Sequence, residues 1–314
     1  AHGALALLID RVRAAQHRFE PTPANLPLLR DICRRLDGLP LALEMAAARV
    51  PALGLAGVHA ALAERFALLT TGHLDAAHRH RTLLAALHWS YGLLPPAEQG
   101  VLRLLAVFAD GFTLDLAVAV AGDDQSSRWA VIDHVAALVD RSLIAVDAQD
   151  PPRYRLLEST RAYARDRLQE AGEADTAWRR LASALLVLYQ QAKAQLRDER
   201  VRATALAEHD NVREAIAQTL HSDPAVAVTL AMHVASLAIF SSWRRQAAQW
   251  LEDCAPVIDQ PGVPPAVRAQ WWHERARQTL MASDPRARDM AARARDLFRA
   301  MADERGVFDT TSAM

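Results

Sequence analysis

The segment most informative about the fold class is LIAVDAQDPPRYRLLESTRAYARDRL, residues 143–168. It holds two short runs with strand-like character, LIAVD (143–147) and RYRLL (153–157), on either side of a turn-rich linker. Pro151 and Pro152 lie in that linker and prevent it from continuing as a helix. The two runs are therefore predicted to pair as a short β-hairpin.

Helices are predicted on both sides of the hairpin. One is expected over about 158–171 and ends at Gly172. Upstream, apolar residues recur every three or four positions along two segments, with Val101, Leu104, Leu105 and Phe108 in one and Val131, Val135 and Leu138 in the other. Helices followed by a β-hairpin are typical of a winged helix. We therefore predict a winged-helix domain over 71–172.

The N-terminal region contains the segment ICRRLDGLPLALEMAAARV, residues 32–50. A helix is predicted over 26–37 with Asn25 as its N-cap, and Gly38 suits the left-handed position that ends it. Pro40 then fits the first position of a second helix. The result is a tight corner whose alanine-rich second helix leaves room for another backbone or a flat ligand. A further helix is expected over about 57–68, followed by a polar connector over 70–81.

The region 175–314 is predicted to consist of helices alone. Three boundaries are marked by Asp223-Pro224, Pro264-Pro265 and Asp284-Pro285, where the acidic residues are expected as N-caps. Helical pairs are expected to begin near 182, 223 and 264, which is a repeat of roughly 40 residues. The fold class is therefore mainly α, with a helical domain, then the winged helix, then a TPR-like α-solenoid whose array is truncated.

Composition excludes several classes of protein. The 314 residues hold 36 Lys and Arg against 37 Asp and Glu, so the net charge of −1 argues against a strongly basic nucleic-acid binder. Two isolated cysteines, Cys33 and Cys254, argue against a disulfide scaffold and favour a reducing cytoplasm. The single lysine, Lys193, follows no glycine-rich turn, so the chain has no P-loop. With no catalytic cluster either, we predict that this chain is not an enzyme.

The longest uncharged stretch, from Pro224 to Trp243, raises the question of a membrane span. It contains His233 and several hydroxyl side chains and is rich in alanine. We predict a buried solenoid helix there and no contact with a membrane.

Histidines in the connector raise the question of a metal site. They are His73, His78 and His80, with His88 nearby. The spacing can bring imidazoles together, but Asp75 is the one carboxylate fixed beside them. Solvated loop histidines are the simpler interpretation, and we predict no metal site.

DNA binding by the winged helix is the next alternative. Residues 79–172 contain 10 Arg and no Lys against 12 Asp and Glu, and the helix before the hairpin, 128–141, sums to zero. A helix that reads DNA neutralises phosphates and is usually basic. We therefore interpret this winged helix as a packing module and predict DNA contact only through an absent N-terminal domain.

Tryptophans in the solenoid offer a further candidate surface. Trp271 and Trp272 are adjacent, so a helix points them about 100° apart. One is expected in its own hairpin core, and the other either packs on the next hairpin or faces a ligand. Trp243 and Trp250 share one helix face and are expected in the core.

Several segments, in order, resemble the NB-ARC/STAND signal-transduction ATPases and in particular their bacterial branch of transcriptional regulators. The GLPLAL motif lies in 32–50, and RHRTLLAALHWSYGLLPPAEQGVLRLLAVFADGFTL, ALVDRSLIAV and PPRYRLLESTRAYARDRL follow in the family's order. The segment AEHDNVREAI (207–216) resembles the one that opens the family's helical-repeat domain. The resemblance runs over roughly 1–220 and more loosely to the end.

The resemblance implies a domain order. Residues 1–70 correspond to the end of the nucleotide-binding region and an ARC1-like helical domain. Residues 71–172 correspond to the regulatory winged helix and 175–314 to the sensor repeats. The family's P-loop, its acidic metal-binding motif and often a DNA-binding domain are expected upstream of residue 1.

The resemblance also implies nucleotide contacts. In the family the GLPL corner lies beside adenine and ribose, so Gly38, Leu39 and Pro40 are candidates to contact ADP or ATP in the full-length protein. The alternative is a purely structural corner. Many members carry Met-His-Asp at the end of the winged helix, where the histidine contacts phosphate. The matching residues here, Leu156 to Glu158, contain no histidine, and His80 or Arg81 are candidate substitutes.

The function implied is that of a regulator switched by ADP and ATP. The winged helix would hold a closed, ADP-bound form, and a protein or small-molecule effector on the solenoid would favour an open form that self-assembles. The alternative is a helical-repeat adaptor that binds a partner protein without nucleotide switching. A cytoplasmic location is expected for both.

Overall fold

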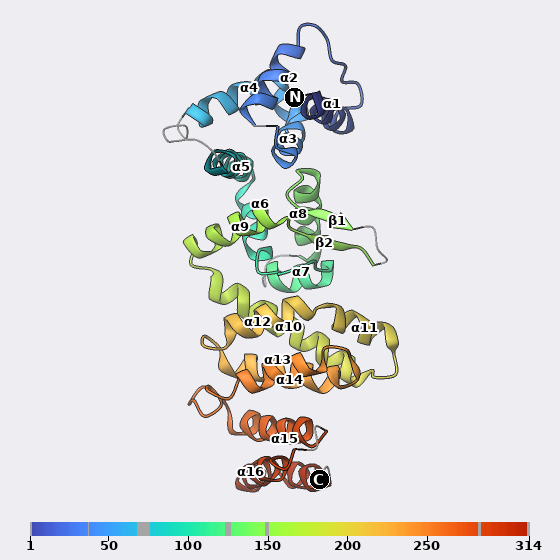
Figure 1. Cartoon of the computed structure of the whole chain (residues 1–314), viewed down its shortest axis with the longest axis vertical. Helices are drawn as coiled ribbons and strands as arrows, with labels where there is room; N and C mark the ends of the chain where they lie inside the picture. The colour runs from blue at the N-terminus through green and yellow to red at the C-terminus, as the bar shows by residue number, and fades with distance from the viewer. Residues whose placement is uncertain are drawn as a thin grey trace. The chain divides into compact units, whose positions relative to one another are not determined.

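The computed structural model describes residues 2–36, 38–67, 76–122, 127–147, 151–281 and 284–312. Within these residues the chain is mainly helical, with one two-stranded hairpin, which confirms the predicted fold class (Figure 1). The chain forms two compact units, one made of 1–106 with 121–168 and the other of 107–120 with 169–314. The three-domain division stays a prediction.

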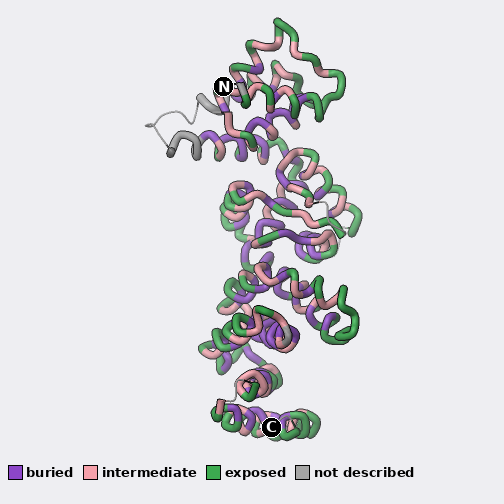
Figure 2. Tube along the Cα trace, turned by 45° about the vertical axis from the view of Figure 1, so that its right-hand side comes forward, coloured by how far each residue is buried: buried purple, intermediate pink, exposed green. Residues whose placement is uncertain are grey.

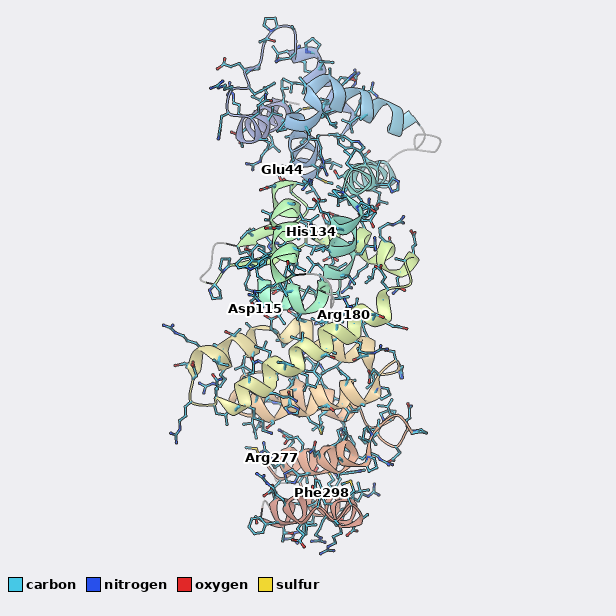
Figure 3. All side chains as sticks on the ribbon, turned by 180° about the vertical axis from the view of Figure 1, so that it is seen from behind. Glu44, Asp115, His134, Arg180, Arg277 and Phe298 are labelled. Atoms are coloured by element: carbon cyan, nitrogen blue, oxygen red, sulfur yellow. The ribbon has the colours of Figure 1, made fainter. Side chains whose placement is uncertain are left out.

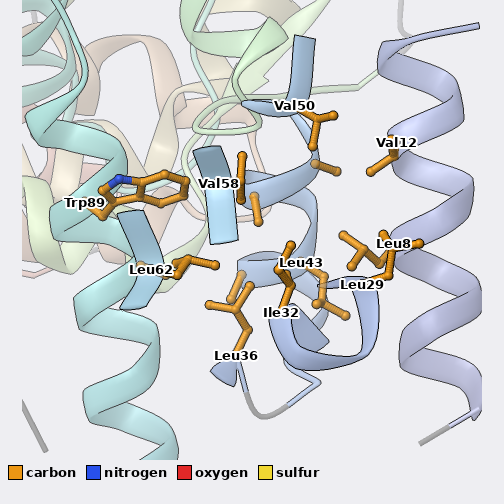
Figure 4. Packing of buried hydrophobic residues seen from close by; sticks show 14 of the residues in the cluster. Leu8, Val12, Leu29, Ile32, Leu36, Leu43, Val50, Val58, Leu62 and Trp89 are labelled. Carbon is orange, nitrogen blue, oxygen red and sulfur yellow. The ribbon is translucent and has the colours of Figure 1, made fainter. Parts of the chain in front are cut away.

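Five helices begin the first unit: α1 (His2–Ala15), α2 (Leu26–Arg35), α3 (Pro40–Ala47), α4 (Val50–Ala67) and α5 (Ala76–Gly92). Their apolar faces share one core (Figure 4). Leu8 and Val12 of α1 point into this core, and Trp89 of α5 closes its other side beside Val58 and Leu62. This core fixes the corner between α2 and α3.

The same unit contains most of the winged helix: α6 (Pro96–Leu105), α8 (Arg128–Asp140), β1 (Ala145–Asp147), β2 (Arg153–Arg155) and α9 (Glu158–Glu170). The strands are antiparallel, with Val146 opposite Tyr154, and are shorter than the predicted runs. Ser127 caps α8, since its Oγ accepts the N–H of Ala130 at 3.1 Å. The predicted hairpin and the helix after it are confirmed.

The second unit contains α7 (Leu114–Ala121), α10 (Ala174–Ala194), α11 (Glu199–Ala207), α12 (His209–Thr219), α13 (Pro224–Leu237), η1 (Ala238–Phe240), α14 (Arg244–Asp253), α15 (Pro265–Met281), α16 (Ala287–Ala300) and α17 (Glu304–Ser312). Buried and exposed positions alternate along these helices (Figure 2). Starts at 224 and 265 match the expected spacing, whereas the first long helix starts at 174 instead of 182.

Asn211 ties the segment 109–111 to α12 inside the second unit. Its Oδ1 accepts the N–H of Ala109 at 2.8 Å, and its Nδ2 donates to Gly111 O at 3.0 Å and to Glu208 Oε2 at 2.6 Å. Asn211 and Glu208 are both buried, so these bonds satisfy polar groups that have lost water. The segment AEHDNVREAI therefore has a structural role in this fold.

Several expected boundaries are wrong. Helix α4 begins at Val50 and not near 57, with a break at Gly54, where φ is +69°. The connector over 70–81 is shorter than expected, because α5 already begins at Ala76. Asn25 does not cap α2 with its side chain, because its Oδ1 accepts the N–H of Thr22 at 2.6 Å instead.

At the other predicted caps, Asp223 accepts the N–H of Val226 and starts α13 as expected. Asp284 does not start α16 directly. Its carboxylate binds the N–H and guanidinium of Arg286, and the helix begins at Ala287.

Among the described residues, no single helix is long and apolar enough to cross a bilayer. Helix α13, which covers most of the long uncharged stretch, has 14 residues. The pair Pro40–Ala47 and Val50–Leu62 reaches the required length and composition only jointly, across a bend of 118°.

Candidate functional site

The corner between α2 and α3 has the geometry expected of a glycine-terminated helix. Gly38 has φ of +66°, its N–H donates to Cys33 O at 2.9 Å, and the N–H of Leu39 donates to Leu36 O at 2.9 Å. A Cβ at Gly38 would lie 3.2 Å from Cβ of Ala4 in α1. Glycine is thus favoured here both by its backbone conformation and by the close approach of α1.

The remaining predicted nucleotide residues are in different settings. Leu39 is half-buried against the core, and Pro40 is exposed at the first position of α3. His80 and Arg81 belong to α5, but their side chains lie outside the described residues. The structure therefore places three of the five candidates at one corner, and their contact with a nucleotide stays a prediction.

A hollow of about 440 Å³ lies in the same unit as this corner. It is lined by α1, α3, the start of α4 and the end of α8, with Arg11, Glu44, Asp140 and Ser142 as its polar residues. Arg11 Nε lies 3.1 Å from Glu44 Oε1 (Figure 3 labels Glu44). Gly38, Leu39 and Pro40 are not among the lining residues, and sequence analysis did not identify this hollow.

A buried charge cluster joins the helical corner to the winged helix. Arg49, in the turn between α3 and α4, is 7% exposed and donates from Nη2 to Ser90 O in α5 at 3.1 Å. Glu98 of α6 is buried and lies 3.2 Å from Arg141 Nη1 at the end of α8. Burial lowers the pKa of Arg49 to about 10, and the charge of Arg141 adds to this effect while Glu98 opposes it. The cluster consists of Arg49, Glu98 and Arg141.

Arg49 was not among the residues predicted from the sequence. The signal available was one cation directly after a largely apolar, alanine-rich helix, because a charge in such a setting is either solvated or paired. The residues that Arg49 interacts with are distant in the sequence, so no local sequence pattern identifies them.

The exposed surface of α8 is not basic. Arg128, Trp129, Asp133, Ala136 and Asp140 are exposed, and Trp129 is 69% exposed. At the hairpin, Arg155 Nε lies 3.3 Å from Asp147 Oδ2, which partly neutralises that arginine. Helix α8 is the one that would enter a DNA groove. Its two exposed acids, Asp133 and Asp140, equal in number the cations Arg128 and Arg141 at its ends.

The metal and tryptophan candidates are placed as follows. Among the described residues no group of three His, Cys, Asp or Glu side chains is arranged to hold a metal ion. His73 and the side chains of His78 and His80 lie outside those residues.

Trp271 is fully buried and donates from Nε1 to Leu251 O at 2.9 Å, whereas Trp272 is half-buried between Arg275 and Arg293. Both therefore have packing roles.

Trp243 and Trp250 differ from the expectation that both lie in the core. Trp250 is buried, but Trp243 is only half-buried, and both pack against His209, with ring centroids 5.3 and 5.7 Å away.

Comparison with known proteins supports the winged helix. Residues 94–169 match the family described as "Winged helix-turn-helix domain". The chain is 40% identical over 216 residues to "Putative HTH-type transcriptional regulator Rv0890c" of Mycobacterium tuberculosis and to its Mycobacterium bovis counterpart Mb0914c, covering 68% of this chain and 24% of each relative. It is also 40% identical over 174 residues to "Uncharacterized protein Rv0894" of M. tuberculosis, covering 55% of this chain and 44% of that protein. No solved structure matches.

Residues 94–169 therefore form a winged helix-turn-helix domain, in a chain similar to proteins named as transcriptional regulators. The matched region spans about a quarter of the length of those regulators. Helix-turn-helix domains are a DNA-binding class. The match is thus partly at odds with the prediction that DNA contact lies only outside this chain.

Proposed function

We propose that this chain is the regulatory portion of a STAND-type regulator of transcription that is switched by ADP and ATP. In the closed form the winged helix packs on the nucleotide-binding module. An effector on the 175–314 repeats favours an open form, which exchanges nucleotide and self-assembles. The ordered motifs of the resemblance and the similarity to named transcriptional regulators support this proposal.

The observation that carries the proposal is the cluster of Arg49, Glu98 and Arg141. Arg49 is bonded to α5, Glu98 of α6 pairs with Arg141 at the end of α8, and the charges of both act on the pKa of Arg49 inside one unit. Separation of the winged helix from the corner would return these charges to water, so a docked and a released arrangement would differ in how the charges are solvated. Such an interface suits a winged helix that is either docked or released.

The corner residues fit one part of a nucleotide. The exposed ring of Pro40 and the half-buried Leu39 offer an apolar surface to the flat face of adenine, and Gly38 keeps the backbone close to α1. These three residues carry no charge that would hold phosphate. ADP or ATP would therefore depend on the longer protein for its phosphate contacts, and the chain alone is proposed to have no enzymatic activity.

Two measurements test the switch. Light scattering of the full-length gene product should show a larger assembly with ATP than with ADP. The Arg49→Met variant should give a larger particle with ADP than the native protein does. Fluorescent ADP should bind that protein saturably at micromolar concentration and bind Pro40→Ala more weakly. Equal particle sizes with both nucleotides, together with unchanged binding by Pro40→Ala, would reject the proposal.

The first alternative is a cytoplasmic helical-repeat adaptor. It predicts partner binding through 175–314 that does not change with nucleotide, so the same scattering experiment separates it from the switch.

The second alternative is DNA contact through the winged helix of this chain, which the helix-turn-helix match favours. The charge of α8 argues against it. Its test is a salt titration of DNA binding by this chain.

A further inference from the structure

A hollow of about 360 Å³ lies among the helices of the second unit. It is lined by residues of α10, α13, α15 and α16 and by α17 with the turn before it. The lining residues include Lys193, Met232, His233, His273, Glu274 and Phe298. Helix α17 approaches closely at Gly306, since a Cβ there would collide with the Phe298 ring (Figure 3 labels Phe298). The volume is within the range of small-molecule sites, about 300–1,000 Å³.

Two cations line this hollow: Arg305, which lies 3.9 Å from Asp309 Oδ2, and Lys193. Lys193 is the only lysine in the chain, and among the described residues no ion pair is formed by its ammonium group. The charge of Lys193 acts electrostatically on the two histidines of the site. Burial lowers the pKa of His233 and of His273, and Lys193 contributes to both shifts. An anionic group entering the hollow would therefore find an unpaired positive charge.

Glu274 supplies the buried acid. The residue is 7% exposed, its Oε1 accepts from Gln278 Nε2 at 2.8 Å, and its Oε2 lies 3.4 Å from Arg277 Nε. Gln278 also donates to Ala235 O at 3.0 Å, so the carboxylate is held in place. A fixed, buried carboxylate favours a ligand with a positively charged hydrogen-bond donor.

His233 supplies an acceptor. Its Nδ1 lies 2.9 Å from Thr229 O, and because a carbonyl oxygen only accepts, Nδ1 carries the proton. Burial keeps the ring neutral, so Nε2 has a free lone pair. His273 is held in turn by Thr310 Oγ1 at 2.9 Å. The site thus combines the ammonium of Lys193, the carboxylate of Glu274 and the acceptor of His233 with the apolar side chains of Met232 and Phe298. Its remaining charged lining residues are Asp303, Arg305 and Asp309.

We propose that this hollow binds a small zwitterion of the amino-acid class. The ligand's carboxylate pairs with Lys193, its ammonium faces Glu274 and Nε2 of His233, and its side chain packs on Met232 and Phe298. This inference deepens the proposed function, because it names the effector class for the repeats. It is tested on this chain alone, so its outcome is independent of nucleotide switching.

The single lysine allows a direct readout. Reductive methylation with ¹³C-formaldehyde labels Lys193 and the N-terminal amine only, and the second signal serves as an internal control. The probes are the twenty L-amino acids at millimolar concentration, each compared with its amine and its acid that lack the other group. At least one amino acid should shift the Lys193 signal saturably and leave the N-terminal signal unchanged.

Variants define the contacts. By thermal shift, Lys193→Met and Glu274→Gln should weaken binding about tenfold or more, as expected for loss of a charged hydrogen bond. Lys193→Arg should retain most of it. Circular dichroism checks that each variant is folded. The proposal is overturned if no amino acid shifts the signal, if the amine or acid alone binds equally well, or if Glu274→Gln binds like the native chain.

Discussion

At the scale of single residues, Arg49 has the largest expected effect on the first unit. Arg49→Met removes the donor to Ser90 O and leaves Glu98 with Arg141 as its charged partner. Disrupting a buried charge cluster should lower the free energy of unfolding by about 2–4 kcal/mol. Urea denaturation of Arg49→Met, Glu98→Gln and the double variant measures both the loss and the coupling. Additive losses in the double variant would mean that the two side chains do not interact.

The two histidines of the second unit should make stability depend on pH. Burial lowers the pKa of His233 and His273 below the usual 6.5, so between 6.5 and the folded values the unfolded chain binds more protons than the fold. Stability is therefore full above pH 6.5 and falls as the pH drops below it. Urea denaturation at pH 7.5, 6.5 and 5.5 measures this dependence. From pH 7.5 to 5.5 the double variant His233→Gln with His273→Gln should lose less free energy of unfolding than the native chain. The same dependence on pH in both proteins would contradict this prediction.

The corner at Gly38 and Pro40 was predictable from the sequence, whereas the Arg49 cluster was not. Glycine and proline have conformational limits that act on the chain locally. Arg49 binds a carbonyl 41 residues away, and only the folded chain brings them together. The hollow around Lys193 was missed for the same reason, since its residues come from separate helices.

At the scale of elements, the break in α4 depends on Gly54. Its φ of +69° and ψ of 162° lie in a region that only glycine occupies readily, although no atom is within 4 Å of an added Cβ. Gly54→Ala should therefore cost about 1–3 kcal/mol of stability through backbone strain alone. Gly100→Ala, inside α6 and free of close contacts, is the matched control and should stabilise by about 0.5–1 kcal/mol. Equal effects of the two substitutions would argue against strain.

The attachment of segment 109–111 to α12 should depend on Asn211. Asn211→Ala leaves the N–H of Ala109 and the carbonyl of Gly111 without this buried partner. We expect a loss of about 2–3 kcal/mol. Hydrogen exchange should show faster exchange at Ala109 and Asp110. Protection equal to that of the native chain would mean that the asparagine does not hold the segment.

Helix existence was easier to predict than helix ends. The starts at Pro224 and Pro265 follow from proline at the first turn, and both are confirmed. The extra length of α4 and α5 was missed, because alanine-rich and polar segments carry weak stop signals.

At the scale of the whole molecule, near-neutral charge decides how the winged helix can act. Acids outnumber arginines over 79–172, and the exposed face of α8 includes Asp133 and Asp140. Fluorescence anisotropy with a 30-bp duplex at 50 mM salt should give a Kd on the order of 100 µM or weaker, because few phosphates are neutralised. Asp133→Arg with Ala136→Arg makes the net charge of that face more positive by three. This variant should bind measurably and lose affinity as salt rises. Tight, strongly salt-dependent binding by the native chain would instead establish the winged helix as the DNA reader and make its packing role unnecessary.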